Sequence, residues 1–193
     1  MRKKQNFRVK IAEFGYRCRN FASILRGMRV LLGARIGSCL GALTMYGELS
    51  AIHILADGTR IDLGVLGRRV VTDDGVAHLV DDWDDGSGNI ENFNFHDSGT
   101  DNTAENVTDS NLIAEAGPTT RATGTKSQPS ANIIRSIGTI AYTGTLAIVE
   151  HGLFSTAART TDLLWDRTVF AVINVENLDS IQFTYSLTVN AGG

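Results

Sequence analysis

Cysteine is absent from the chain after residue 39, because both of its cysteines, Cys18 and Cys39, lie near the N-terminus. Proline is also scarce, with 2 residues against 20 glycines in a chain of 193. Without thiols, the body of the chain has neither a disulfide framework nor a cysteine metal site to hold it together. The shortage of proline, beside many threonines and asparagines in the second half, is typical of short strands joined by tight turns.

Basic residues are concentrated in the first quarter of the chain, although the formal net charge is only -3. Residues 1–50 contain ten Lys or Arg against two Glu, a net charge of +8, so the remaining residues carry -11. This asymmetry indicates a basic N-terminal arm that binds an acidic partner or packs on its own acidic body. Because the arm lacks the aromatic stacking pattern of nucleic-acid modules, we expect an acidic protein surface as its first partner and nucleic acid as the second.

The apolar residues of the arm, between Val9 and Ile36, are spaced loosely as in helices. Five glycines from Gly15 to Gly41 interrupt this pattern, and each costs up to about 1 kcal/mol relative to alanine inside a helix. The sequence therefore predicts an arm that is only partly helical, without long helices. Arg35 also breaks the longest apolar run, so we expect no membrane-spanning segment and no membrane partner.

The origin of the arm stays open at the level of sequence, because Met45 lies directly before the first well-patterned strand. One hypothesis is that translation begins at Met45 and that the mature protein lacks the arm. The other is that the arm is a real docking element for neighbouring subunits. Mass spectrometry of the native N-terminus distinguishes the two.

A hairpin and a short helix open the body of the chain. Residues 49–55 and 60–65 flank the dipeptide Asp57-Gly58, which supplies the positive φ angles of a tight turn. A helix is then predicted over residues 73–83, with the Thr72 hydroxyl as its cap. Apolar side chains on one face of this helix are expected to pack against a sheet. They are Val76, Leu79, Val80 and Trp83.

The remaining strands are predicted from apolar patterns between turn residues, with the polar tract 97–106 as a surface loop. They cover residues 93–95, 119–126, 132–142, 146–154, 164–175 and 181–189. The last of them alternates apolar and polar residues at every position, as a half-buried strand does. Seven or eight strands at this spacing predict a mainly β chain: a basic, partly helical arm (residues 1–47) and an antiparallel β-sandwich or jelly-roll-like domain (residues 48–193).

Three segments of the C-terminal half resemble a family of small structural proteins of tailed-bacteriophage virions. In order, they are Glu150–Ser155 (EHGLFS), Leu163–Phe170 (LLWDRTVF) and Leu178–Val189 (LDSIQFTYSLTV). In that family a strand of the type E-x-G-L-F comes first and one of the type D-S-[IL]-x-[FV]-x-Y-x-L-T comes last. The upstream runs 56–59, 69–72 and 95–100 are similar as well, so the resemblance covers roughly residues 50–193.

The resemblance implies a non-enzymatic β-sandwich subunit located in the virion. A capsid decoration or cement protein is the first expectation, because the chain is compact and lacks the repetitive shaft of a fibre. Its implied partners are the major capsid protein or tail proteins, and further copies of itself in a dimer or trimer. The alternative is a tail-fibre, collar or other tail-associated domain that binds a host-surface glycan or a tail partner. A depolymerising enzyme is a third hypothesis.

An acidic cluster at the end of the predicted helix is the first candidate for a metal site. Its members are Asp81, Asp82, Asp84 and Asp85. Closely spaced oxygen ligands hold Ca²⁺ in many proteins, but the EF-hand register fails here, because Gly86 occupies the next alternate position and the twelfth position is not glutamate. We therefore expect a solvated helix end and no metal ligands.

Other candidate side chains also lack the spacing that a catalytic or metal site requires. Carboxylates for glycosidase chemistry are Asp82, Glu91, Glu115, Glu150 and Asp166, and no pattern pairs two of them across a cleft. The histidines are His53, His78, His96 and His151, and each is expected in a polar turn or at a strand edge. The sequence thus predicts no catalytic residue, no cofactor and no enzyme.

Strand geometry gives one specific expectation about charged residues. Adjacent residues of a strand point to opposite faces, so Glu150 and His151 are not expected to form a dyad. For the same reason either Asp166 or Arg167 must face the core or a partner. One hypothesis is that Arg167 pairs with Glu150 across strands, and the alternative is an ordinary surface charge worth under about 1 kcal/mol. A fully solvated Arg167 would contradict the pair.

Overall fold

The computed structural model of the chain describes residues 2–69, 71–85, 90–159 and 163–192. The helices are α1 (Arg2–Arg19), α2 (Phe21–Cys39), α3 (Asp73–Asp85) and the 3-10 helix η1 (Ile90–Asn92). The strands are β1 (Thr44–Ile54), β2 (Arg60–Arg69), β3 (Phe95–Gly99), β4 (Glu115–Ala116), β5 (Ala122–Thr123), β6 (Thr125–Ser130), β7 (Ile133–Ala141), β8 (Leu146–Phe154), β9 (Leu164–Val175) and β10 (Ser180–Asn190).

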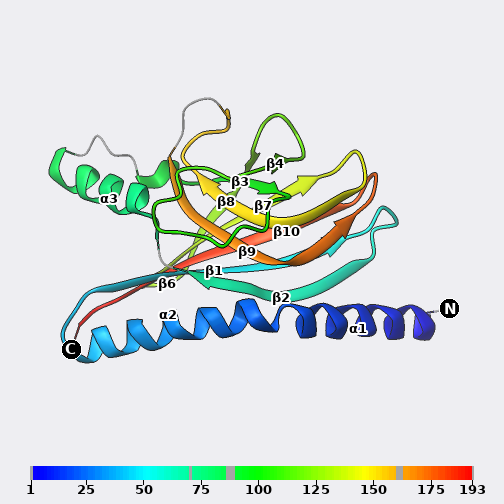
Figure 1. Cartoon of the computed structure of the whole chain (residues 1–193), viewed down its shortest axis with the longest axis horizontal. Helices are drawn as coiled ribbons and strands as arrows, with labels where there is room; N and C mark the ends of the chain where they lie inside the picture. Colours follow the sequence, from blue (N-terminus) through cyan, green and yellow to red (C-terminus); the bar gives the residue numbers. More distant parts are fainter. Residues whose placement is uncertain (1, 70, 86–89, 160–162, 193) are drawn as a thin grey trace.

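These strands form two antiparallel sheets, as Figure 1 shows. The first sheet has the order β2-β1-β10-β7-β6, and the second has the order β4-β3-β8-β9 with β5 paired to β3. The described part of the chain is therefore mainly β, as predicted. The ten described strands exceed the expected seven or eight because β4 and β5 are pairings of only two residues each.

The larger of two hydrophobic clusters combines side chains of the two sheets, and the smaller contains Leu112, Phe154 and Leu164. Leu49 of β1 and Phe183 of β10 come from the first sheet, while Ile148 of β8 and Phe170 of β9 come from the second, and none is more than 4% exposed. Fully burying such a side chain contributes roughly 1.5–3 kcal/mol. The first half of β10 alternates buried and half-buried residues, so its predicted core face is confirmed there.

The opening hairpin also agrees with its prediction. Strands β1 and β2 pair in antiparallel register, and Gly58 in their turn has a φ angle of +81°. The backbone N–H of Thr59 donates a hydrogen bond to Asp57 Oδ1 at 2.8 Å. The positive φ explains the glycine, because residues with a side chain rarely adopt this conformation.

The prediction of a surface loop over residues 97–106 is wrong for its first three residues. Asp97 and Ser98 lie within β3 and are 1% and 0% exposed. A carboxylate can occupy such a buried strand because two arginines, Arg121 and Arg159, pair with Asp97. The polar residues at the start of this segment therefore belong to a layer of buried ion pairs and are not exposed to solvent.

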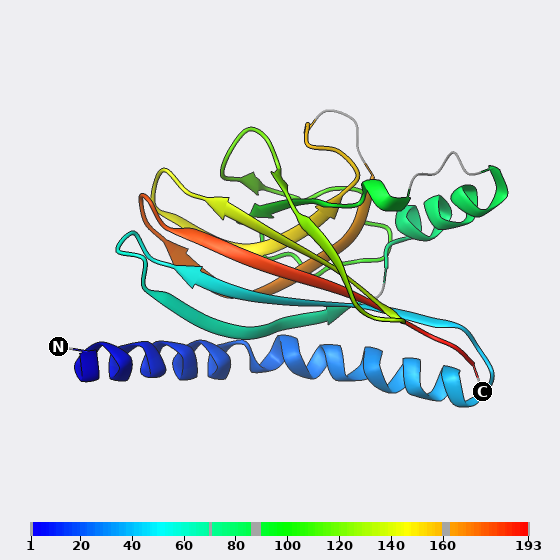
Figure 2. The same ribbon diagram turned by 180° about the vertical axis from the view of Figure 1, so that it is seen from behind.

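The N-terminal arm forms two helices, and the expectation that glycines prevent long helices is wrong. Helix α1 has 18 residues and α2 has 19, and together they run as one rod along the β2 side of the body (Figures 1 and 2). A Cβ atom on Gly27 would lie 2.9 Å from Cβ of Arg68 and 3.1 Å from its backbone nitrogen. Glycine thus lets α2 approach β2 closely, and this tertiary contact outweighs the low helix propensity of glycine.

The side chain of Asn20, at the junction of α1 and α2, connects the arm to both sheets by hydrogen bonds. Its Nδ2 donates to the carbonyl oxygens of Leu66 (2.7 Å) and Val65 (3.2 Å) in β2. Its Oδ1 accepts a hydrogen bond from the backbone N–H of Ala171 in β9 at 3.0 Å. Because β2 and β9 end the strand orders of their sheets, Asn20 bridges two edges that would otherwise present unpaired backbone groups. The arm is therefore part of the folded unit, and β1 already begins at Thr44.

Helix α3 starts as predicted but packs differently. The backbone N–H of Gly75 donates to the Thr72 hydroxyl oxygen at 3.1 Å, which confirms the cap. However, Val76, Val80 and Trp83 are 43%, 61% and 85% exposed, so the expected packing of this face against a sheet is wrong. Leu79, the fourth residue of the predicted face, lies at its border and does pack on the core, on the side of the helix that contains the buried Gly75.

Candidate interaction surface and buried polar layer

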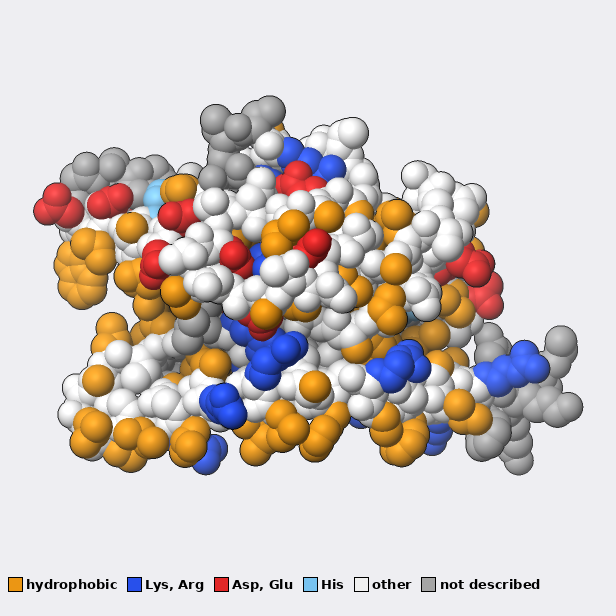
Figure 3. All heavy atoms as spheres, viewed as in Figure 1, with side chains coloured by type: hydrophobic (Ala, Val, Ile, Leu, Met, Phe, Trp, Pro, Cys, Tyr) orange, Lys and Arg blue, Asp and Glu red, His pale blue; other side chains and the backbone are white. Residues whose placement is uncertain are grey.

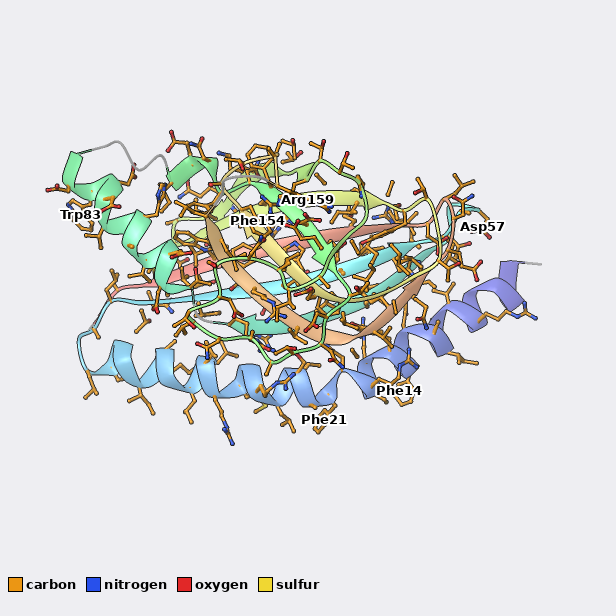
Figure 4. The ribbon with its side chains drawn as sticks, turned by 45° about the horizontal axis from the view of Figure 1, so that its top comes forward. Phe14, Phe21, Asp57, Trp83, Phe154 and Arg159 are labelled. Atoms are coloured by element: carbon orange, nitrogen blue, oxygen red, sulfur yellow. The ribbon has the colours of Figure 1, made fainter. Side chains whose placement is uncertain are left out.

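The outer face of the helical arm carries a row of exposed apolar side chains, which we call the arm stripe. Its members are Ile11, Phe14, Phe21, Leu25, Met28, Leu32 and Ile36, each between 46% and 72% exposed. Steps of three, four or seven residues place them on one helical face. Phe14 and Phe21 point away from the sheets in Figure 4, and the stripe follows the lower edge of the molecule in Figure 3.

The face that meets the sheets is made of smaller or polar residues. Tyr16, Asn20, Ser23, Gly27 and Ala34 are buried there. The Tyr16 hydroxyl donates to the carbonyl of Ala171 at 2.9 Å, and burial raises the pKa of this phenol. A surface helix of a globular domain usually turns its large apolar residues inward. The arm does the reverse, and a contiguous exposed apolar face of this kind marks an interaction site.

Basic side chains border the arm stripe along α2. Arg26, Arg29 and Arg35 are exposed, and no acidic partner within ion-pair distance occurs among the described residues. At 100° per residue, Arg35 lies on one side of the stripe and the other two lie on the opposite side. In α1, by contrast, Arg17 already pairs with Asp62 at 3.3 Å. Within the described residues, no helix is long and apolar enough to cross a membrane.

The predicted pair between Arg167 and Glu150 is confirmed. Arg167 Nε lies 2.8 Å from Glu150 Oε2, and both side chains are at most 1% exposed. Arg167 also pairs with Asp109 at 3.0 Å, and the backbone N–H groups of Ile113 and Ala114 donate to Glu150. The loop after β3 is thereby fixed onto β8 and β9 through buried charges.

A second group of buried charges fixes two further loops. Asp97 of β3 accepts hydrogen bonds from Arg121 at 3.3 Å and from Arg159 at 2.9 Å, and both arginines also pair with Glu115. The Arg121 guanidinium lies 3.5 Å from the centre of the Phe154 ring, a cation–π contact. The hydrogen bond and charge of Asp97 raise the pKa of Arg159.

The expected turn or strand-edge positions are wrong for all four histidines, because three are buried in strands that are paired on both sides and the fourth lies in α3. The buried three are His53, His96 and His151, and His78 is the residue in α3. His96 Nδ1 and His151 Nε2 are 2.9 Å apart, and His96 Nε2 is 2.8 Å from the Ser136 hydroxyl. Because Ser136 donates to Asn94, His96 donates to Ser136 through Nε2 and accepts from His151 through Nδ1. Burial lowers the pKa of His96 to about 3 and that of His151 well below 6.5. His53 Nε2 lies 2.9 Å from Asp179 Oδ2, and the rings of His78 and Phe93 lie nearly perpendicular with centroids 5.0 Å apart.

This buried histidine pair predicts acid lability. Both rings are neutral when folded and have an ordinary pKa near 6.5 when unfolded, so their contribution to stability is complete above pH 6.5 and is lost as the pH falls. We expect a loss of about 1.4 kcal/mol per histidine and pH unit below pH 6.5, measured by urea unfolding at several pH values. The His151→Asn variant should show about half this slope. An unchanged slope in that variant would contradict the assignment.

Asp166 gives an opposing and separable pH dependence. Burial raises its pKa to about 6, although Thr168 donates to its Oδ1 at 2.8 Å. A carboxyl group whose pKa is raised by folding stabilises the protein fully below its unfolded pKa and loses this effect as the pH rises through the folded value. Asp166→Asn therefore serves as the background in which the histidine slope is measured alone.

The other candidate carboxylates do not converge on one site. Within the described residues, no group of three His, Cys, Asp or Glu side chains is arranged to hold a metal ion. Asp81 and Asp84 are exposed on the last turns of α3, whereas the side chain of Asp85 lies outside the described part. Glu150 and Asp166 belong to separate buried networks, because Glu150 pairs with Arg167 and Asp166 contacts Thr168 and Tyr185.

An apolar cavity of about 420 Å³ lies between η1 and the β6–β7 hairpin. Phe93, Leu153 and Trp165 are buried among its lining residues, while Lys126 and Gln128 are exposed. This volume falls within the roughly 300–1,000 Å³ of ligand pockets. The lining suits a small apolar group, such as part of a ligand or one side chain of a partner.

No protein-family model, curated protein or solved structure matches this chain. The site assignments therefore rest on the geometry of its own residues. The Glu150–Arg167 pair was a hypothesis from the sequence, because adjacent residues of a strand face opposite ways and one of Asp166 and Arg167 must face inward. Sequence reasoning missed the arm stripe as a solvent-facing surface, although the spacing of Leu25, Met28 and Leu32 was visible, because spacing alone does not tell which face of a helix is covered.

Proposed function

We propose that this chain is a non-enzymatic structural protein of a tailed-phage particle, a capsid decoration protein that stabilises the shell by binding neighbouring subunits. The observation that carries the proposal is the arm stripe, a long apolar face on a helix that is itself fixed to the body. Burying such a face between subunits stabilises an assembly by mass action. The resemblance of residues 150–189 to virion proteins supports the same role.

We also propose that the two antiparallel sheets, which share the main core, form a jelly-roll-like β-sandwich, and the interior positions of β1 and β10 in the first sheet support this. Buried ion pairs at Glu150 and Asp97 hold the loops against the second sheet, so the subunit offers a fixed shape to its neighbours.

The copy number per particle tests this function. In particles assembled from the genome that encodes the chain, we expect hundreds of copies by quantitative mass spectrometry. We also expect labelled chains to cover the head in electron micrographs. The major capsid protein measured in the same sample serves as the internal standard. Absence of the chain from purified particles would refute the proposal.

A tail-associated binding domain is the second candidate, and the apolar cavity beside Trp165 favours it. A handful of copies per particle, with label confined to the tail, would replace the decoration role by this one. Glycan arrays with the full chain would then test recognition of host-surface sugars, with Gln128→Ala at the cavity as the informative variant.

A further inference from the structure

Helix α3 carries a second exposed apolar row, which we call the α3 stripe. It consists of Val76, Val80 and Trp83, spaced by four and three residues. Trp83 projects from the end of the molecule in Figure 4. The helix contains six aspartates and no lysine or arginine in 13 residues, and Asp73, Asp81 and Asp84 are exposed without a basic partner among the described residues.

The two stripes are complementary in shape and in charge. Leu25, Met28 and Leu32 of the arm stripe are spaced by three and four residues, so two turns of α2 match the two turns of the α3 stripe. Arg26, Arg29 and Arg35 border the first row, whereas aspartates accompany the second. An amphipathic helix laid on another helix with opposite charges at its borders is a recurrent mode of recognition.

The two stripes do not meet within one chain. Helix α3 lies on the same side of α1–α2 as the sheets, whereas the arm stripe faces the opposite side (Figures 1 and 3). Only α3 of another molecule can reach the arm stripe. The α2 half of the stripe is the better receptor, because Arg17 in α1 is already paired with Asp62 and Glu13 adds a negative charge there.

We propose that the α2 half of the arm stripe binds α3 of a second copy of this chain, so that copies associate head to tail. Such a heterologous contact uses two different surfaces and closes into a ring, for example a trimer, or extends into a filament. This inference rests on the proposed function in one respect, because it names a second copy of the chain as one neighbour of each subunit. Other surfaces of the chain remain to bind the capsid.

Sedimentation velocity of the full chain at low and high salt tests this contact. We expect association that weakens as salt rises, because screening reduces attraction between exposed charges. Met28→Ser and Trp83→Ser should each lower the association constant about tenfold or more, as central residues of an interface do. Phe14→Ser is the matched control in the α1 half of the stripe and should leave association unchanged.

A charge swap gives the decisive result. Arg29→Glu with Arg35→Glu should abolish association, as should Asp81→Lys with Asp84→Lys, whereas an equimolar mixture of the two double variants should associate again. Arg8→Glu with Lys10→Glu, a double reversal in α1, should have no such effect. All these positions are exposed, so circular dichroism should show an unchanged fold.

Four outcomes would overturn the contact. The first is a monomer at every concentration, and the second is a failure of the mixed variants to associate. The third is a dimer that loses affinity with Met28→Ser but not with Trp83→Ser. The fourth is flotation of a monomeric chain with phosphatidylglycerol vesicles. The third indicates a symmetric pairing of two arm stripes, and the fourth indicates an anionic membrane surface as the partner. A monomeric chain that is abundant in particles refutes this inference alone, whereas an associating chain absent from particles refutes only the proposed function.

Discussion

Replacing Arg167 by Met is expected to lower the free energy of unfolding by about 3–5 kcal/mol, the usual cost of removing one partner from a buried ion pair. The change leaves Glu150, which is 0% exposed, without its counter-charge, and it also removes the link to Asp109. Urea unfolding followed by tryptophan fluorescence measures the loss. Trp165 lies two residues away on β9 and is 2% exposed, so it should report the transition.

A double variant separates the lost charge pair from lost packing. Glu150→Gln with Arg167→Met removes both charges while the amide still accepts hydrogen bonds from the loop, so it should be more stable than Arg167→Met alone. Arg135→Met, at a partly exposed arginine, should change stability by less than about 1 kcal/mol. Full stability of Arg167→Met would show that the buried pair contributes nothing.

Deleting residues 1–43 is expected to cause the largest loss, so that the remaining chain aggregates or unfolds well below the melting temperature of the full chain. The deletion removes Tyr16 from the core and strips Asn20 from the edges of β2 and β9. Exposed strand edges pair with other chains, and unsatisfied buried backbone groups cost about 1–3 kcal/mol each. Light scattering during thermal unfolding measures both effects.

Two point variants show whether the inner face of the arm is responsible. Asn20→Ala should destabilise the full chain by roughly 2–3 kcal/mol, since three backbone partners lose their hydrogen bonds. Met28→Ser, on the outer face of α2, should change monomer stability by less than about 0.5 kcal/mol. A truncated chain that melts with the full chain would instead favour translation from Met45, and mass spectrometry of the native N-terminus would then decide.

The strands were predictable because their patterns are local. Residues 146–154 and 164–175 have the bounds of β8 and β9, since apolar residues and turn residues mark both ends. Once two strands are placed, alternation also determines which neighbours share a face, and this led to the hypothesis of the Glu150–Arg167 pair. The hairpin at Gly58 follows from turn chemistry in the same way.

The arm and the buried histidines were not predictable, because tertiary contacts determine them. Glycine at position 27 lowers helix propensity, yet it permits the close approach to Arg68 that holds α2 on β2. Nothing local distinguishes His96 and His151 from surface histidines, since their partners are distant in sequence. The prediction that the apolar face of α3 packs on a sheet was wrong for a related reason. An amphipathic pattern fits a partner molecule as well as a sheet of the same chain.

The position of Asn20 also has a mechanical consequence for a force applied to the helical arm. The Asn20 side chain forms hydrogen bonds with β2 of one sheet and β9 of the other. The nearby Ser23 hydroxyl donates a further hydrogen bond to the carbonyl of Val169 at 3.0 Å. A pull on α2 is therefore divided between both sheets and does not peel a single edge strand from its neighbour. Tension that a bound neighbour applies to α2 would therefore reach the shared core as a distributed stress.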